Sequence, residues 1–281
     1  GGGLGNYAPG EWSDDTQMAL CIAEVAATGA DLTETSALDD NAVKFEQWYA
    51  TGPADIGIQT RQVLALAARL DGRPSSRLTE ASRQVHDQTG RSAGNGALMR
   101  TSPVALAYLN DPDRAIEAAR TIAALTHHDP LAGDSCVLWT DLIRRAVLDG
   151  ELARADLELI PAGRRDYWAG LVADAEQQSP RTFVPNGDTM RAFQAAYASV
   201  RTASRRTDSA GLVEEGLVEA ILVGNDTDTV AAIAGGLLGG LAGLRSIPEQ
   251  WVRDINGWPG YRADGLVQMA HAIVGQSPGT D

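Results

Sequence analysis

Helical periodicity runs along almost the whole chain and constrains its fold more than any other feature. After a polar start, Met18, Cys21, Ile22 and Val25 follow the i, i+3, i+4, i+7 spacing that gathers apolar side chains on one face of a helix. Similar patterns favour helices over 43–49, 56–70, 76–89, 103–109, 112–126, 130–149, 164–177, 187–202, 209–223, 227–243 and 260–274. Alternating β-branched runs, which would indicate strands, cannot be found. The sequence therefore predicts an all-α bundle of about ten or more helices.

Nothing in the sequence requires a domain boundary. The softest stretches are 71–78, 150–163, 178–187 and the tail 276–281, and no repeat at a solenoid period occurs. With 281 residues, 44% of them hydrophobic, the chain can bury most of its apolar surface in one core. We therefore expect one helical domain over residues 1–281.

The charge balance is acidic, with 37 Asp and Glu against 23 Lys and Arg and a net charge of −14. This balance argues against a nucleic-acid or anionic-membrane surface, where a basic patch is expected. Cys21 and Cys136 lie in apolar helical patterns and make no disulfide framework. With no visible signal peptide and no apolar run long enough to span a bilayer, we expect a cytoplasmic protein. Because residue 1 is Gly, we also expect that the natural N-terminal segment is missing.

The first acidic motif, Ser13-Asp14-Asp15-Thr16, opens the first predicted helix. One interpretation is a plain helix start, in which Ser13 caps the helix and the acids in the first turn are stabilised by the helix dipole. The other is a ligand set, because hydroxyl and carboxylate oxygens occupy four consecutive positions. On its own the motif leaves both interpretations open.

The second acidic motif, Asp226-Thr227-Asp228-Thr229, also precedes a predicted helix, and a capping role is again the alternative. Together the two motifs would supply four carboxylates without any Cys or His. Such hard oxygen donors favour Mg²⁺, Mn²⁺ or Ca²⁺ over zinc. Four carboxylates close together repel one another unless cations neutralise them, so the pair of motifs predicts a two-metal site.

A glycine-flanked loop and a histidine are further candidates. Gly94 and Gly96 on either side of Asn95 allow close backbone approach, and successive amides there could bind a diphosphate, although most such loops are ordinary turns. Arg100 either contacts a phosphate or forms a structural ion pair. His127 either hydrogen-bonds to a helix end or faces the ligand.

These motifs resemble those of the ADP-ribosylglycohydrolases, in the order found in that family, and most closely those of its bacterial dinitrogenase-reductase-activating branch. The resemblance runs from residue 1 to about Trp251. Its motifs are Trp12-Ser13-Asp14-Asp15-Thr16, Ala93-Gly94-Asn95-Gly96 with Met99-Arg100, Thr126-His127, and Asp226-Thr227-Asp228-Thr229. The family usually has Thr where this chain has Ser13, a change that keeps the hydroxyl.

The resemblance implies an all-α fold with two Mg²⁺ or Mn²⁺ ions in a central cleft. The implied metal ligands are Ser13, Asp14, Asp15, Asp226, Asp228 and Thr229. The implied ligand-binding residues are Gly57, Gly94, Asn95, Gly96, Met99, Arg100 and His127, with Gly94 to Gly96 along the diphosphate. Asp14, Asp15 and Asp55 are the implied catalytic residues, Asp55 and Gly57 lying in a less distinctive loop.

The implied function is metal-dependent hydrolysis of the glycosidic bond in ADP-ribosylated substrates, with arginine-linked ADP-ribose on proteins favoured. The implied partners are ADP-ribose or an ADP-ribosylated protein, and the oligomeric state stays open. The family's N-terminal helix and glutamate-bearing loop have no match here, so an inactive ADP-ribose-binding or regulatory protein is the alternative. A structural helical domain, like the crystallins related to this family, is a third.

Overall fold

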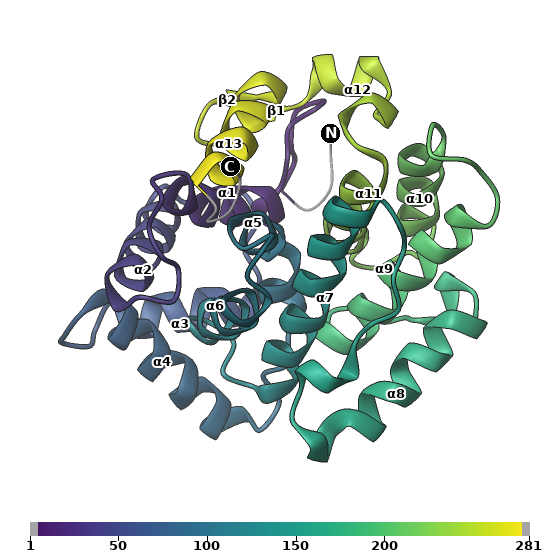
Figure 1. Ribbon diagram of the computed structural model, residues 1–281. Coiled ribbons are helices and arrows are strands. Elements are labelled where there is room, and N and C mark those ends of the chain that lie inside the picture. The colour runs from purple at the N-terminus through teal and green to yellow at the C-terminus, as the bar shows by residue number, and fades with distance from the viewer. Residues whose placement is uncertain (1–4, 277–281) are drawn as a thin grey trace.

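Helices form nearly all the regular structure in the computed structural model, which describes residues 5–276 (Figure 1). The α-helices are α1 (Asp14–Ala26), α2 (Thr35–Ala50), α3 (Ile58–Ala67), α4 (Pro74–Thr89), α5 (Ser102–Ala107), α6 (Pro112–Ala124), α7 (Pro130–Asp149), α8 (Ala162–Gln177), α9 (Thr189–Ser204), α10 (Leu212–Ile221), α11 (Thr227–Ala242), α12 (Glu249–Asp254) and α13 (Ala263–Gln276). Short 3₁₀-helices are η1 (Asn95–Arg100), η2 (Leu157–Leu159), η3 (Pro180–Thr182) and η4 (Leu244–Ser246). The predicted all-α class is confirmed.

The centre of the core lies where α7, α9 and α11 pack together. Phe193 of α9 packs edge-on against Trp139 of α7 and Trp168 of α8, with ring centroids 5.2 and 5.3 Å apart. The indole nitrogen of Trp139 donates to the Ile233 carbonyl of α11 at 3.1 Å. A large aromatic ring stabilises the core only if its polar atom finds a partner, and this bond satisfies that need while joining two helices. The three helices therefore pack together as one core.

The two ends of the described chain meet, because α13 packs against α1 and α5 (Figure 1). A short antiparallel hairpin, β1 (Asn256–Gly257) and β2 (Tyr261–Arg262), precedes α13. Sequence analysis expected a helix from residue 260 and no strand, and it gave no helix at the position of α12. Two-residue strands are too short to leave an alternating pattern, so periodicity could not detect them.

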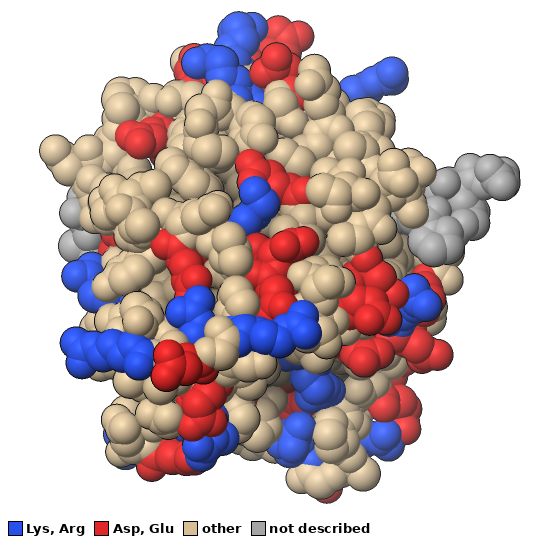
Figure 2. All heavy atoms as spheres, turned by 90° about the vertical axis from the view of Figure 1, so that its left-hand side faces the viewer, with Lys and Arg blue, Asp and Glu red and all other residues tan. Residues whose placement is uncertain are grey.

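Charges of both signs mix on the face of the molecule that carries α2 (Figure 2). Three ion pairs on this side join Lys44 to Glu24 at 2.6 Å, Arg73 to Asp39 at 2.6 Å and Arg77 to Glu46 at 2.9 Å. Basic side chains on this face are thus interspersed with acidic ones. None of the helices between residues 5 and 276 is long and apolar enough to span a bilayer.

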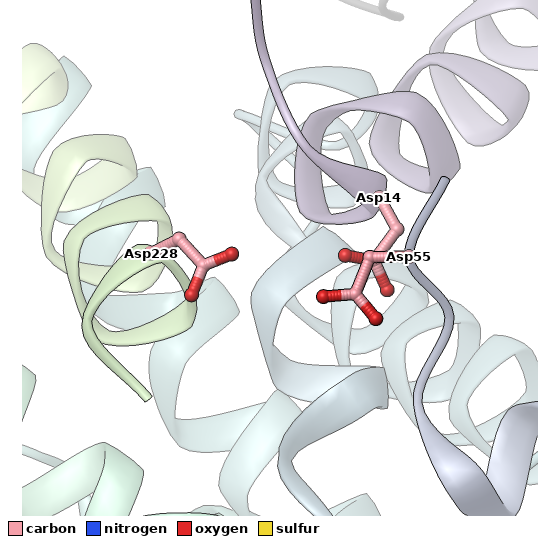
Figure 3. A group of neighbouring side chains, drawn as sticks. All are labelled: Asp14, Asp55 and Asp228. Carbon is pink, nitrogen blue, oxygen red and sulfur yellow. The ribbon is translucent and has the colours of Figure 1, made fainter. Parts of the chain in front are cut away.

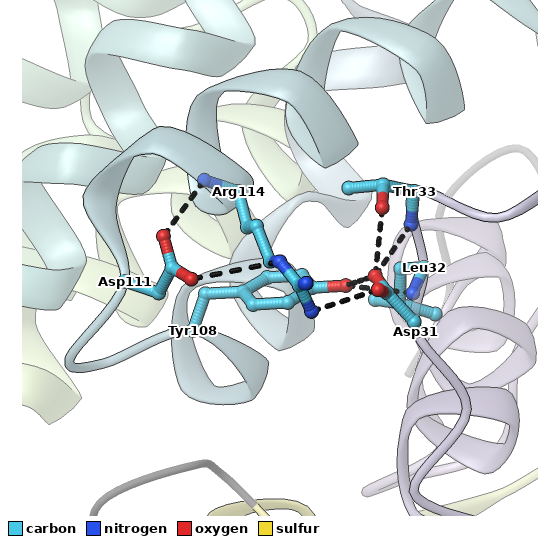
Figure 4. A network of polar contacts seen from close by, with 6 residues as sticks. All are labelled: Asp31, Leu32, Thr33, Tyr108, Asp111 and Arg114. Atoms are coloured by element: carbon cyan, nitrogen blue, oxygen red, sulfur yellow. Dashed lines mark hydrogen bonds and ion pairs between the residues drawn. The ribbon is translucent and has the colours of Figure 1, made fainter.

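A polar network fixes the loop between α1 and α2 to the end of α5 (Figure 4). The Tyr108 hydroxyl donates to Asp31 Oδ1 at 2.6 Å and accepts the Leu32 amide at 2.7 Å. Asp31 also accepts from the Thr33 amide and hydroxyl and from Arg114. Leu32 is fully buried, so its amide depends on Tyr108 for a partner. One phenol therefore closes the loop that follows α1.

We expect Tyr108→Phe to lower the free energy of unfolding by about 1–3 kcal/mol, because the buried Leu32 amide loses its acceptor. Urea unfolding followed by circular dichroism measures this change. Arg114→Gln is the matched control, since Arg114 is half exposed and its ion pair with Asp31 should contribute at most about 1 kcal/mol. Equal losses in the two variants would contradict this assignment of the network.

Candidate functional site

The first acidic motif does not form an ordinary helix cap. Ser13 is at the N-cap position of α1, but its side chain makes no capping hydrogen bond and instead donates to Asp15 Oδ2 at 2.5 Å. Asp14 is 8% exposed and Asp15 only 1%, although both lie in the first turn. Carboxylates used only for their attraction to a helix dipole would normally remain in water. The burial of both side chains favours the ligand interpretation over the capping one.

The C-terminal hairpin holds the segment that leads into this motif. The Trp12 amide donates to the Asn256 carbonyl at 3.0 Å, and the Trp12 indole donates to the Trp258 carbonyl at 2.9 Å. Asn256 returns a bond from its amide to the Gly10 carbonyl at 2.9 Å. A Cβ at Gly257 would lie 2.5 Å from the Trp12 indole nitrogen, so only glycine permits this contact. Residues near the end of the chain therefore fix where α1 begins.

The second acidic motif is held in a similar way at the start of α11. Asp226 occupies the N-cap position without a side-chain capping bond, and its Oδ2 accepts from Asn95 Nδ2 at 2.7 Å. The Thr229 side chain, one turn into α11, interacts with both Asp226 and Asp15. The structure thus brings the two motifs and the Asn95 loop together.

Asp14, Asp55 and Asp228 form the centre of the site (Figure 3). One carboxylate oxygen from each lies within 4.8 Å of the others. Figure 3 shows Asp14 and Asp55 side by side, with Asp228 facing them from α11. They come from α1, from the loop before α3 and from the first turn of α11. The structure therefore groups Asp55 with the two acidic motifs.

Burial raises the pKa values of three aspartates at this site. Burial, followed by the charges of Asp55 and Asp228, raises the pKa of Asp14 to about 7. Burial and the Asp14 charge raise the pKa of Asp15 well above its ordinary value, and burial also raises the pKa of Asp226. The Oδ1 atom of Asp15 is buried without a hydrogen-bond partner among the described residues. An all-oxygen set with one unsatisfied carboxylate oxygen fits a hard divalent cation, and these residues could hold one.

Glycine makes room for a neutral histidine beside this group. A Cβ on Gly94 would lie 3.2 Å from His127 Nε2, and one on Gly96 would lie 3.1 Å from His127 Cε1. His127 is 3% exposed, and burial followed by the Arg100 charge lowers its pKa to about 3. The imidazole is therefore uncharged near neutral pH and packs directly against the glycine loop.

The predicted loop of Asp55 and Gly57 also reaches the glycine loop. Gly57 is exposed and ends that loop at the start of α3. One turn later, the Thr60 hydroxyl would lie 3.3 Å from a Cβ on Gly96. Gln59 donates to the Thr126 carbonyl at 3.0 Å, which ties α3 to the segment that bears the histidine. These contacts place the two loops side by side.

Arg100 and Met99 differ from the other predicted ligand-binding residues. Arg100 is fully buried, with its guanidinium 4.5 Å from the centre of the Phe45 ring. It donates to the Thr126 hydroxyl at 2.7 Å and to the Ile122 carbonyl at 3.4 Å. Met99 is 6% exposed. The structure thus places Arg100 in the core rather than at a phosphate, with its guanidinium against an aromatic ring and its Nε without a hydrogen-bond partner among the described residues.

Asn186 is a supporting residue that sequence analysis missed. It is fully buried, and its Oδ1 accepts the Asp226 amide at 3.0 Å while its Nδ2 donates to the Gly224 carbonyl at 3.1 Å. Its backbone carbonyl accepts from Asn95 Nδ2 at 3.1 Å. One side chain therefore sets the geometry of the turn before α11. Asn186 lies between Pro185 and Gly187 in a segment whose composition is typical of a loop. Nothing in that composition indicates a residue that supports an acidic motif.

Comparisons with known proteins agree with this architecture. A family model described as ADP-ribosylglycohydrolase matches residues 2–280. The chain is 26% identical to "ADP-ribosylarginine hydrolase Tri1" of Pseudomonas putida (strain GB-1), covering 100% of this chain and 71% of that protein. It is 26% identical to "ADP-ribosyl-[dinitrogen reductase] glycohydrolase" of Rhodospirillum rubrum, covering 91% and 77%. A solved "ADP-ribosylglycohydrolase-related protein complex" aligns with a TM-score of 0.70 and 28% identity over 99% of this chain and 86% of that one.

The raised pKa values predict how pH and metal ions act together on stability. Below about pH 4 Asp14 carries its proton in both the folded and the unfolded protein, and between there and about pH 7 the folded protein keeps the Asp14 proton that the unfolded chain has lost. The contribution of Asp14 to the free energy of unfolding of the metal-free protein therefore falls as pH rises through this range. Because Mg²⁺ competes with those protons, its stabilising effect should grow from pH 5 to pH 8.

Differential scanning fluorimetry with and without saturating Mg²⁺ measures this difference at each pH. His127 has a lowered pKa and acts in the opposite direction, but it contributes to both curves and cancels in the difference. An increment in melting temperature that is constant or falls with pH would contradict a carboxylate metal site.

We expect Asn186→Ala to weaken Mn²⁺ binding by about 10- to 100-fold, as is typical when a residue that orients a ligand is removed. Asn186→Asp keeps the acceptor for the Asp226 amide and should bind more tightly than the alanine variant. Calorimetric titration of both variants measures the effect. Wild-type affinity in Asn186→Ala would show that the turn before α11 holds its shape without this side chain.

Proposed function

This chain belongs to the ADP-ribosylglycohydrolase family, whose members are hydrolases of glycosidic bonds, and we propose that it removes ADP-ribose from arginine side chains of modified proteins with two divalent cations. The observation that carries the proposal is the convergence of Asp14, Asp55 and Asp228 from three separate elements. The arginine linkage is favoured because similar proteins include an ADP-ribosylarginine hydrolase.

The two acidic motifs would hold the cations, which we propose to be Mg²⁺ or Mn²⁺. The proposed ligands are Ser13, Asp14, Asp15, Asp226, Asp228 and Thr229. Supporting this set, Asp15 has an unpartnered buried oxygen and the three central carboxylates lie within 4.8 Å of one another. When bound, such ions supply Lewis-acid stabilisation and orient the ribose hydroxyls.

The glycine loop and the histidine would bind the rest of the ligand. Amides around Gly94 and Gly96 would face the diphosphate, and neutral His127 would contribute a polar surface without a charge that must be desolvated. Asn95 donates to Asp226 at 2.7 Å, so the glycine loop, Gly94 to Gly96, and the second acidic motif would be positioned together.

Asp55 is the proposed general base. Its Oδ1 accepts the Ile56 amide at 2.7 Å, which orients the carboxylate and leaves Oδ2 for another partner. Water would attack the anomeric carbon as the bond to the guanidinium nitrogen breaks, and Asp55 Oδ2 would accept the proton that the water loses. That proton then passes to the departing guanidine. Neighbouring carboxylates would stabilise the cationic character of the sugar in the transition state.

We expect Asp228→Asn and Asp55→Asn each to lower kcat/KM for an ADP-ribosylated arginine peptide by at least about 100-fold in Mg²⁺. Asp166→Asn, an exposed acid on α8, is the matched control and should retain full activity. Release of ADP-ribose measured by chromatography gives the rates, and a serine-linked peptide run in parallel tests the linkage.

Activity of wild type on the serine-linked peptide alone would overturn the arginine assignment. Tight binding of ADP-ribose by wild type without turnover of either peptide would select the alternative of an inactive binding protein. Full activity in Asp228→Asn would show that the group of Asp14, Asp55 and Asp228 is not required for catalysis.

A further inference from the structure

A tyrosine outside the sequence motifs points its hydroxyl at the acidic group. Tyr7 as a whole is partly exposed, but its hydroxyl oxygen is buried and has no hydrogen-bond partner among the described residues. The phenol lies close to the carboxylates of Asp14, Asp55 and Asp15 and beside the backbone amide of Asp55. The ring is therefore accessible from one side, while its polar end is directed into the site.

The local backbone fixes this orientation. Asn6 has a positive φ of 53°, which turns the chain immediately before the tyrosine. A Cβ at Gly5 would lie 2.5 Å from Tyr7 Cε2, so the ring folds over the glycine backbone and a larger residue there would displace it.

A buried hydroxyl without a partner is costly, by about 1–3 kcal/mol, and such groups in native proteins usually have a reason. Here the neighbouring carboxylates do not supply a bond within the protein. A tyrosine hydroxyl ordinarily carries its proton near neutral pH, so it is available as a donor.

We propose that Tyr7 is a specificity-determining residue whose hydroxyl donates a hydrogen bond to a ribose hydroxyl oxygen held at the Asp14, Asp55 and Asp228 group. This inference rests on the proposed function for the identity of the sugar. The sugar oxygen is the acceptor that the phenol lacks in the ligand-free protein. Tyr7 would thus distinguish ligands that carry the second ribose from those that end at the diphosphate.

The test compares ADP-ribose with ADP, which lacks the second ribose, by calorimetry in Mg²⁺. Loss of one hydrogen bond contributing about 0.5–1.5 kcal/mol predicts that Tyr7→Phe weakens ADP-ribose binding by about 2- to 12-fold. Binding of ADP should not change. Tyr167→Phe, in which the altered tyrosine is exposed on α8, is the matched control and should bind both ligands like wild type.

Two further readouts separate this role from a structural one. Tyr7→Phe removes an unsatisfied buried hydroxyl, so the melting temperature of the ligand-free protein should stay equal or rise. In turnover assays KM should rise with little change in kcat, as expected for a contact made equally in the ground and transition states.

Equal weakening of ADP and ADP-ribose together with a lower melting temperature would overturn the proposal in favour of a structural tyrosine. Unchanged ADP-ribose affinity would also overturn it, as would a wild-type protein that binds no ADP-ribose. If wild type binds ADP-ribose but cleaves no peptide, the proposed hydrolase function fails while the comparison of the two ligands still decides the role of Tyr7.

Discussion

The close approach of carboxylates from three separate elements is the constraint on which the site depends, with Asp14 buried, Asp55 half-buried and Asp228 exposed. Two unit charges 4 Å apart repel by about 4 kcal/mol at the effective dielectric constant of a protein surface region, and here one carboxylate oxygen from each of three aspartates lies within 4.8 Å of the others. The helix that carries Asp228, α11, packs against α7 and α9 of the aromatic core around Phe193, while α1, which carries Asp14, packs chiefly against α2, α5 and η1. The core thus supplies the rigidity that keeps the acidic group assembled.

Support for the site comes from segments far away along the chain. The hairpin at Asn256 fixes the entry to α1, and Asn186 fixes the entry to α11. The hairpin does so through backbone hydrogen bonds, and Asn186 does so through hydrogen bonds from its side chain to backbone groups. A carboxylate in a first turn moves with its helix start, so these bonds control the separation between the two motifs more directly than contacts along the helix bodies do.

The sequence was sufficient where the information was local. Helix positions followed from periodicity, and the two acidic motifs were visible because hydroxyl and carboxylate residues are contiguous in each. Arg100 could not be placed in this way, because its burial depends on Phe45 and Thr126, which lie 55 and 26 positions away (100 − 45 and 126 − 100). The role of Asn186 likewise follows from partners 38 to 91 positions distant, and the short strands gave no pattern to detect.

Both acidic motifs lie at helix N-termini, where the helix dipole stabilises ionised carboxylates. A helix N-terminus favours a nearby negative charge by roughly 0.3–1 kcal/mol, and up to about 2 kcal/mol when partly buried. Two such termini, those of α1 and α11, face the carboxylates, yet the pKa of Asp14 is still raised to about 7. Dipoles of this size are smaller than the repulsion of about 4 kcal/mol between two unit charges 4 Å apart, so the two helix ends do not offset the burial and the neighbouring charges that raise this pKa. Divalent cations bound at the group, as we propose, would supply the further positive charge that favours the ionised form of Asp14.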